Sequence, residues 1–190
     1  MKWLARILLA LVALLLLGVL GLFLAGKREG ASFHQGSVEI ARPPEQVWRY
    51  LTDPVLARKW RSGILEVTPL TEGGTRVGAR ERVLVSVGEG ETMVVEDEIT
   101  RLEAPHRLEL TLKSGPGSDV SFVEQVAYTL EEQGGGTKLT FTGRTEFSGV
   151  AALLEPIITP AAEGSLEKEL QALKATVEAE PASAPATVQP

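Results

Sequence analysis

Six runs of alternating apolar and polar residues fill the middle of this 190-residue chain. Side chains of a β-strand point alternately to the two faces of a sheet, so each run predicts a strand with one buried face. Short segments rich in glycine or proline separate the runs, which is typical of hairpins in an antiparallel sheet. The runs are ILEVTPL from Ile64, TRVGARERVLVSV from Thr75, ETMVVEDEITRL from Glu91, HRLELTLKS from His106, SFVEQVAYTLEE from Ser121 and TKLTFTGRTEF from Thr137.

A strand and two short helices are expected before these runs. Residues 37–41, SVEIA, alternate as a strand does, and Pro43-Pro44 then ends the pairing and starts a helix over EQVWRYL. Asp53-Pro54 has the pattern of a cap followed by a first-turn proline, so a second short helix is expected through VLARKW. Trp48 and Trp60 are interpreted as packing anchors of this connection, in preference to ligand contacts.

A long helix is expected after the last run. From Val150 the apolar residues recur at helical spacing, and Leu166, Leu170, Leu173 and Val177 share one face. Pro156 and Pro160 are expected to kink this helix or to delay its start.

The N-terminal residues predict a membrane anchor. Residues 7–26 contain no charged or strongly polar side chain, and about 20 apolar residues suffice to cross a bilayer as a helix. A cleaved secretory signal is the alternative, but its apolar core is shorter and ends at a site of small residues. Similar numbers of basic residues flank the two ends of the segment, so the positive-inside rule hardly distinguishes the two orientations. We expect a single-pass protein of the cell membrane with its domain on the extracytoplasmic side.

The rest of the composition indicates the domain limits and argues against nucleic-acid binding and against metal or cofactor sites. We expect an anchor over 1–26, a linker over 27–36, one domain over 37–179 and a Pro/Ala-rich disordered tail over 180–190. The net charge of −6 and the lack of a basic run argue against nucleic-acid binding, and we expect a monomeric domain. With no cysteine and only two histidines, no metal and no cofactor are expected.

The order of these elements resembles the SRPBCC superfamily of START-related, polyketide-cyclase-like and birch-allergen-like domains. The resemblance covers 37–178, and it implies an α+β helix-grip fold in which a curved antiparallel sheet of about seven strands wraps around the C-terminal helix. It also implies an apolar cavity between sheet and helix, closed at one end by the two short helices, but no universal catalytic residue. The segments that carry the resemblance are VEIARPPEQVWRYLTDPVLARKW, VGAR, EAPHRL, GGGTKLTFT and LEKELQALKATVE.

Alternate positions along each run define the face expected to point inward. These faces are mostly apolar and begin, in the second run, with Val77 and Ala79. The candidate ligand-binding residues are Trp60, Val83, Val85, Met93, Val95, Asp97, Phe122, Glu124, Val126, Tyr128, Phe141, Leu154 and Ile158. On the opposite, solvent-facing alternation lie Arg80, Arg82 and Arg144.

Three carboxylates, Glu81, Asp97 and Glu124, interrupt the inward faces. A buried carboxylate needs a partner, water or a raised pKa, although a β-bulge could turn any of them outward. The leading hypothesis is binding of an apolar small molecule or lipid at the membrane, without chemistry. An enzyme of the cyclase or dehydratase type would instead use the three carboxylates for acid–base catalysis. A protein-interaction module with a filled cavity is the third hypothesis.

Overall fold

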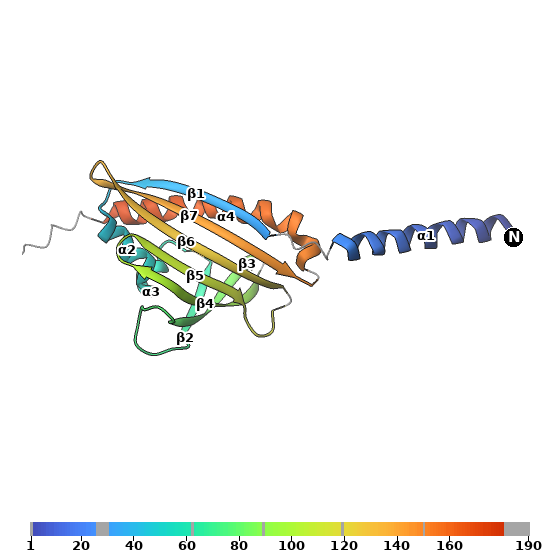
Figure 1. Ribbon diagram of the computed structural model, residues 1–190, viewed down its shortest axis with the longest axis horizontal. Helices are drawn as coiled ribbons and strands as arrows, with labels where there is room; N and C mark the ends of the chain where they lie inside the picture. Colours follow the sequence, from blue (N-terminus) through green and yellow to red (C-terminus); the bar gives the residue numbers. More distant parts are fainter. Residues whose placement is uncertain are drawn as a thin grey trace, which may run out of the picture.

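The computed structural model describes residues 2–25, 31–61, 63–88, 90–118, 120–149 and 151–180 of the protein. Seven strands follow one another as an antiparallel sheet, with two short helices after the first strand and a long helix after the last (Figure 1). In chain order the elements are α1 (Lys2–Ala25), β1 (Ala31–Ile40), α2 (Pro44–Thr52), α3 (Pro54–Ala57), β2 (Ile64–Pro69), β3 (Arg80–Gly88), β4 (Glu91–Glu103), β5 (Arg107–Ser114), β6 (Ser121–Gln133), β7 (Gly136–Ser148) and α4 (Ala151–Ala179).

The strands lie in the order β1-β7-β6-β5-β4-β3-β2, so β2 to β7 form a meander and β1 joins the last strand. All neighbouring strands run antiparallel, as the six alternating runs predict. The first strand is longer than residues 37–41, because it begins at Ala31, in the segment predicted to be a linker. In this extension His34 pairs with Gly143 of β7.

The third strand begins later than predicted. Residues 75–78 form bends and turns, Gly78 has a φ of 80°, and β3 starts at Arg80. Val77 is therefore 56% exposed and does not face inward, which corrects the prediction for that residue. From Arg80 to Ser86 the register with β4 is regular, so the alternation of buried and solvent-facing positions holds there.

The helix α4 packs along β1 and β7 and supplies the main core contact of the sheet. Leu170, Leu173 and Val177 are at most 3% exposed, and Leu166 packs beside them, as their spacing predicts. The helix begins at Ala151, so neither Pro156 nor Pro160 delays its start. The helix α4 contacts the sheet near one edge, whereas α2, α3 and the segment that follows them face β3, β4 and β5 across a cavity.

The two short helices form as their capping residues predict, although α3 is shorter than expected. Asp53 caps α3 by accepting hydrogen bonds from the backbone N–H groups of Val55 and Leu56, at 2.8 and 3.3 Å. The helix ends at Ala57, and a turn then carries Trp60 into the core. The indole N–H of Trp60 donates a 3.0 Å hydrogen bond to the carbonyl oxygen of Tyr50, which ties the turn to α2.

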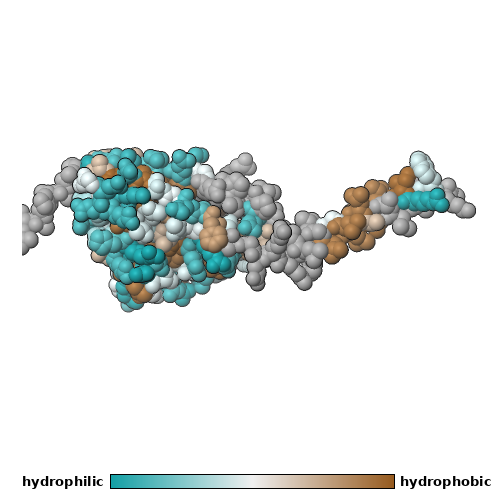
Figure 2. Space-filling view, turned by 45° about the horizontal axis from the view of Figure 1, so that its top comes forward, coloured by the Kyte–Doolittle hydropathy of each residue, from teal (hydrophilic) through white to brown (hydrophobic). Residues whose placement is uncertain are grey.

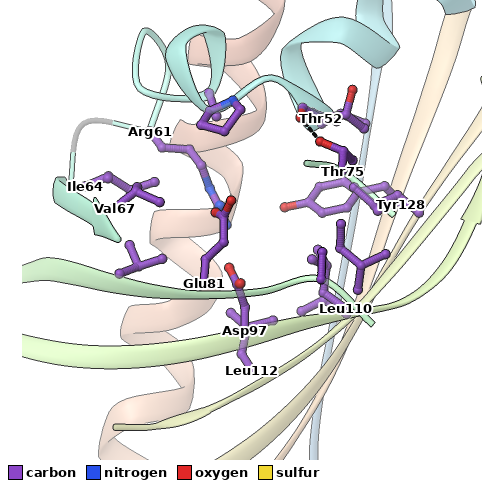
Figure 3. A pocket seen from close by; sticks show the side chains of 18 of the residues that line it. Thr52, Arg61, Ile64, Val67, Thr75, Glu81, Asp97, Leu110, Leu112 and Tyr128 are labelled. Carbon is purple, nitrogen blue, oxygen red and sulfur yellow. Dashed lines mark hydrogen bonds between the residues drawn. The ribbon is translucent and has the colours of Figure 1, made fainter. Parts of the chain in front are cut away.

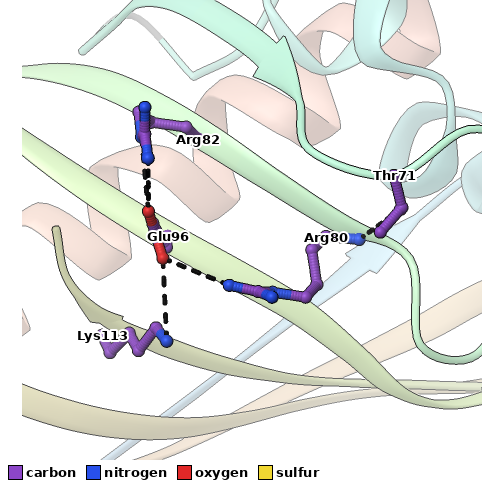
Figure 4. A network of polar contacts seen from close by, with 5 residues as sticks. All are labelled: Thr71, Arg80, Arg82, Glu96 and Lys113. Atoms are coloured by element: carbon purple, nitrogen blue, oxygen red, sulfur yellow. Dashed lines mark hydrogen bonds and ion pairs between the residues drawn. The ribbon is translucent and has the colours of Figure 1, made fainter.

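On the outer face of the sheet, the carboxylate of Glu96 lies close to three cationic side chains (Figure 4). Glu96 lies 2.8 Å from Arg82, 3.4 Å from Arg80 and 3.6 Å from Lys113. The hydrogen bond from Arg82 and the charges of all three cations lower the pKa of Glu96, against the opposing effect of its burial. Arg80 and Arg82 thus lie on the outer face, and so does Arg144, which pairs with Glu146 at 2.8 Å.

The helix α1 exposes most of its described apolar side chains, and Figure 2 shows them gathered along it, whereas the visible face of the domain is largely hydrophilic. Leu14 and Leu17, for example, are 73% and 68% exposed. Within the part of the chain that the structure describes, no helix combines the length and hydropathy needed to cross a membrane. The predicted anchor, residues 7–26, extends beyond that part and stays a prediction.

Candidate binding cavity

A cavity of about 90 Å³ lies between the inner face of the sheet and the α2–α3 connection. Thr52 and Trp60 lie on the helical side, and Thr75, whose hydroxyl donates a 3.0 Å hydrogen bond to the Thr52 carbonyl oxygen, lies at the margin (Figure 3). The apolar side chains of the lining are Leu51, Ala57, Trp60, Ile64, Val67, Ala79, Val83, Ile99, Leu108, Leu110, Leu112 and Val126. Most of the wall is therefore hydrocarbon, as is typical of a small-molecule site.

Four ionisable side chains from different parts of the chain interrupt this apolar wall. Arg61 follows the turn after α3, Glu81 lies on β3, Asp97 on β4 and Tyr128 on β6. Glu81 and Asp97 are paired opposite each other in the register of β3 and β4. Figure 3 shows the Arg61 guanidinium directed toward these two carboxylates and the Tyr128 hydroxyl directed into the space beside them.

The two carboxylates have raised affinities for protons. Burial, followed by the neighbouring charge of Glu81, raises the pKa of Asp97 to about 6, although Arg61 and a backbone hydrogen bond oppose the change. Burial also raises the pKa of Glu81. Burial disfavours the ionised form of both carboxylates, and for Asp97 the charge of Glu81 on the adjacent strand adds to this effect.

Arg61 is the cation nearest to these groups. Burial alone would lower the pKa of Arg61, but Tyr128, Glu169, Asp97 and Glu124 together outweigh that effect and raise it. Its guanidinium carbon also lies 5.3 Å from the centre of the Trp60 ring, a cation–π distance. Among the described side chains, Arg61 forms no direct ion pair.

Tyr128 provides a hydroxyl that lacks a hydrogen-bond partner among the described residues, although the side chain is only 4% exposed. Its ring packs edge-on against Phe141 at 5.1 Å, which holds it in place. Burial raises the pKa of Tyr128, so the hydroxyl is neutral near pH 7 and can both donate and accept a hydrogen bond.

A second cavity of about 250 Å³ adjoins the first. The two share Arg61, Ile64, Val83, Asp97 and Leu112, so Arg61 and Asp97 lie where they meet. The second cavity reaches α4 at Glu169, in agreement with the expected space between sheet and C-terminal helix. The first cavity differs from that expectation, because α2, α3 and the following segment close it in place of the described part of α4.

A separate polar pair lies on the inner face near the other end of the sheet. The Nε2 atom of His34 lies 2.8 Å from a carboxylate oxygen of Glu124. The His34 ring stacks on Phe141 at 5.6 Å and lies over Gly143, where any larger side chain would overlap it. The pair forms because β1 is longer than predicted and because Gly143 leaves room for the imidazole.

The predicted site residues divide into three groups. Trp60, Val83, Val85, Val95, Asp97, Val126 and Tyr128 line one or both cavities. Met93, Phe122, Glu124 and Phe141 are absent from both linings, since Phe122 packs against Phe147, Glu124 against His34 and Phe141 against Tyr128. The side chains of Leu154 and Ile158 lie outside the described residues.

Sequence reasoning missed Arg61, the only cation of the cavity lining among the described residues. Arg61 directly follows Trp60 in a connection that was expected to close one end of the cavity. Its position in the sequence could therefore have indicated a positive charge near the cavity. Glu81 was predicted to point inward but was not among the ligand-binding candidates, and it does line the cavity. Within the described part of the chain, no cluster of histidine and carboxylate side chains could hold a metal ion.

Comparisons with solved structures show the same fold in proteins of low sequence identity. The protein Ara h 8.0201 aligns with a TM-score of 0.62 at 18% identity, over 80% of this chain and all of its own. A protein from Chromobacterium violaceum gives 0.60 at 21% identity, over 77% of this chain and 96% of its own. A protein from Thermus thermophilus, TTHA0849, gives 0.60 at 20% identity, over 78% and 98%. These likenesses confirm the helix-grip fold.

The sequence itself matches one protein family. No curated protein is significantly similar to this chain. A family described as "Polyketide cyclase / dehydrase and lipid transport" matches residues 34–178, which is most of the chain and includes every lining residue of both cavities. The superfamily expected from the order of the elements is thus confirmed, and the chain belongs to the polyketide cyclase / dehydrase and lipid transport family.

Proposed function

We propose that this protein binds a small, largely apolar molecule in the two adjoining cavities and does not alter it. The family supports ligand binding in general. The observation that carries the proposal is an apolar lining interrupted by a few convergent polar groups, among them the cavity-facing hydroxyl of a tyrosine that has no hydrogen-bond partner among the described residues. A ligand in the cavity would supply this hydroxyl with a hydrogen-bond partner.

The volumes favour a small ligand. Pockets for drug-sized molecules commonly measure about 300–1,000 Å³. The cavity of about 90 Å³ is below this range by itself, whereas the adjoining one of about 250 Å³ approaches it. A ligand that passes Arg61 and Asp97 could occupy both. The existence of this space favours a binding protein over an interaction module with a filled interior.

We expect the full-length protein to carry an apolar molecule after gentle purification, detectable as added mass by native mass spectrometry. Purification in two chemically different detergents separates a true ligand, whose mass is the same in both, from bound detergent. Ala79→Phe should reduce this added mass, because the phenyl ring enters the first cavity, while Ala175→Phe on the exposed face of α4 should not. Protein that is empty in both detergents, and that takes up no added alcohol, would refute the proposal.

An enzyme is the second candidate. The paired Glu81 and Asp97 favour it, because a carboxyl with a pKa of about 6 can donate and accept protons near neutral pH. The same mass measurement distinguishes the two. A binding protein returns an added compound unchanged, whereas a dehydratase returns it lighter by one water, and the loss disappears in Asp97→Asn.

We infer that residues 7–26 anchor the protein in the cell membrane, with the cavity domain on the extracytoplasmic side. The support is the run of apolar residues and the exposure of the described apolar side chains of α1. Alkaline carbonate extraction should leave the protein in the membrane pellet, and alkaline phosphatase fused to its C-terminus should be active. Recovery in the supernatant with a mature start near Lys27 would eliminate the anchor, and activity of a cytosol-only reporter in its place would reverse the orientation.

A further inference from the structure

The junction of the two cavities contains more negative than positive groups. Arg61, from the segment after α3, and Asp97 on β4 line both cavities, and Glu81 on β3 lines the first cavity beside them (Figure 3). Glu124 on β6 and Glu169 on α4 also act on Arg61. One guanidinium therefore faces several carboxylates, and Glu81 and Asp97 alone outnumber it.

The other basic side chains around the sheet do not restore the balance. His34 is engaged with Glu124 at 2.8 Å, so it can offset at most that carboxylate. Lys113, Arg80 and Arg82 lie across the sheet, where Glu96 binds them. Among the described residues, Glu81 and Asp97 thus share Arg61 as their nearest cation.

Tyr128 gives an independent indication of a bound group at the same place. Its side chain is 4% exposed, its hydroxyl is directed into the cavity, and no described residue hydrogen-bonds to it. A carboxylate pair offers acceptors only, and a tyrosine hydroxyl can act as a further acceptor. The polar part of the junction is therefore rich in acceptors and low in positive charge.

Three classes of polar head group can be compared at this position. A carboxylate or phosphate would bring a further negative charge next to Glu81 and Asp97, and like charges in a poorly hydrated site repel strongly. A neutral hydroxyl could bond to Tyr128 but would leave the charge imbalance. An ammonium group has three donors, no acceptor and the missing positive charge.

We propose that the ligand is an amphiphilic amine whose ammonium group lies among Glu81, Asp97 and Tyr128 while its hydrocarbon part fills the apolar cavities. This inference rests on the proposed binding function and adds the chemical class of the ligand. Charge-assisted hydrogen bonds are stronger than neutral ones, so the ammonium group supplies both affinity and selectivity.

The test compares three probes with the same hydrocarbon chain, hexylamine, 1-hexanol and hexanoate. Each is titrated calorimetrically into the full-length protein held in a neutral detergent, and a titration into detergent alone is subtracted. Near neutral pH, hexylamine should bind at least about tenfold more tightly than either other probe. Equal affinities, or tighter binding of hexanol or hexanoate, would overturn the proposal while the binding function stands. If none of the probes binds, the proposed function itself fails.

Matched variants locate the binding. Asp97→Asn and Glu81→Gln should each remove most of the preference for hexylamine and leave hexanol binding nearly unchanged, because they remove charge and retain shape. Glu98→Gln removes a carboxylate from the exposed face of the same strand and should change nothing. A hexylamine preference that survives both inner variants would mean that the amine binds elsewhere, and the proposal would be wrong.

The pH dependence gives a second readout at the same site. The charged groups that affect the pKa of Asp97 are Glu81 and Arg61. The pKa of Arg61 is in turn affected by Glu124, Glu169 and Tyr128. Because the pKa of Asp97 is about 6, its carboxyl becomes neutral as the pH falls through that value. Hexylamine affinity should therefore decrease severalfold between about pH 7.5 and pH 5, while hexanol affinity stays constant. An amine affinity independent of pH would contradict the assignment.

Discussion

Replacing Leu173 with alanine should lower the free energy of unfolding by about 2–5 kcal/mol, the range observed for buried leucines. Leu173 is fully buried on the face of α4 that packs on the sheet, among Ile40, Leu139 and the other core side chains. Truncation removes apolar contact and leaves a void between layers that relax only partly. Urea denaturation of the full-length protein, followed by tryptophan fluorescence, measures the change as a lower midpoint at constant slope.

Leu65→Ala is the matched control for this experiment. Leu65 lies on the edge strand β2 and is 52% exposed, so the same chemical change should cost less than about 1 kcal/mol there. Similar effects of the two substitutions would mean that α4 does not pack on the sheet as described, and the position of the cavities would have to be revised with it.

Replacing Asp97 with asparagine should stabilise the protein near neutral pH, by about 2–3 kcal/mol at most. The pKa of Asp97 rises from 3.8 to about 6 on folding, and a difference of one pH unit corresponds to about 1.4 kcal/mol. Below 3.8 the carboxyl is protonated in both states, so its ionisation has no effect on stability. Between 3.8 and about 6 the unfolded chain ionises first and the folded state loses stability, and above about 6 the full penalty applies.

The measurement is a denaturation series of wild type and Asp97→Asn at about pH 4 and about pH 7.5, in the absence of ligand. Wild type and Asp97→Asn should have similar free energies of unfolding at the lower pH, and Asp97→Asn should have the higher one at the higher pH. Glu98→Gln controls for the loss of a carboxylate on the exposed face of β4. A destabilised Asp97→Asn variant at the higher pH would show that Asp97 acts as a stabilising partner of Arg61, contrary to this account.

Much of the fold follows from the sequence because its signals are local. Alternation predicts the strands β2 and β4 to β7 to within a few residues, and Pro44 and Asp53 mark the starts of α2 and α3. The first strand and β3 were less well predicted. Their ends depend on pairing with a distant partner, since β1 extends to Ala31 along β7 and β3 starts only after Gly78 has turned the chain.

The candidate site was predictable only in part. Asp97 and Tyr128 follow from strand alternation, which assigns a face to every second residue. Arg61 comes from an irregular segment, where no periodicity assigns a direction. Glu124 and Phe141 point inward, as alternation predicts, but they contact His34. This contact could not be predicted because His34 was not expected to lie in β1.

The pairing of β1 with β7 also sets an order in which a newly made chain can acquire its structure. Ile40 pairs with Thr137 and Ala31 with Glu146, so the first strand of the domain has its partner only after nearly all the sheet has been synthesised. Contacts between residues far apart in sequence form slowly, because the intervening chain must be ordered first. Until then the hydrogen-bonding edge that β1 presents to β7 stays unpaired. The helix α4 follows β7 in the chain, so the second cavity, which α4 borders at Glu169, is the last of the two to be closed.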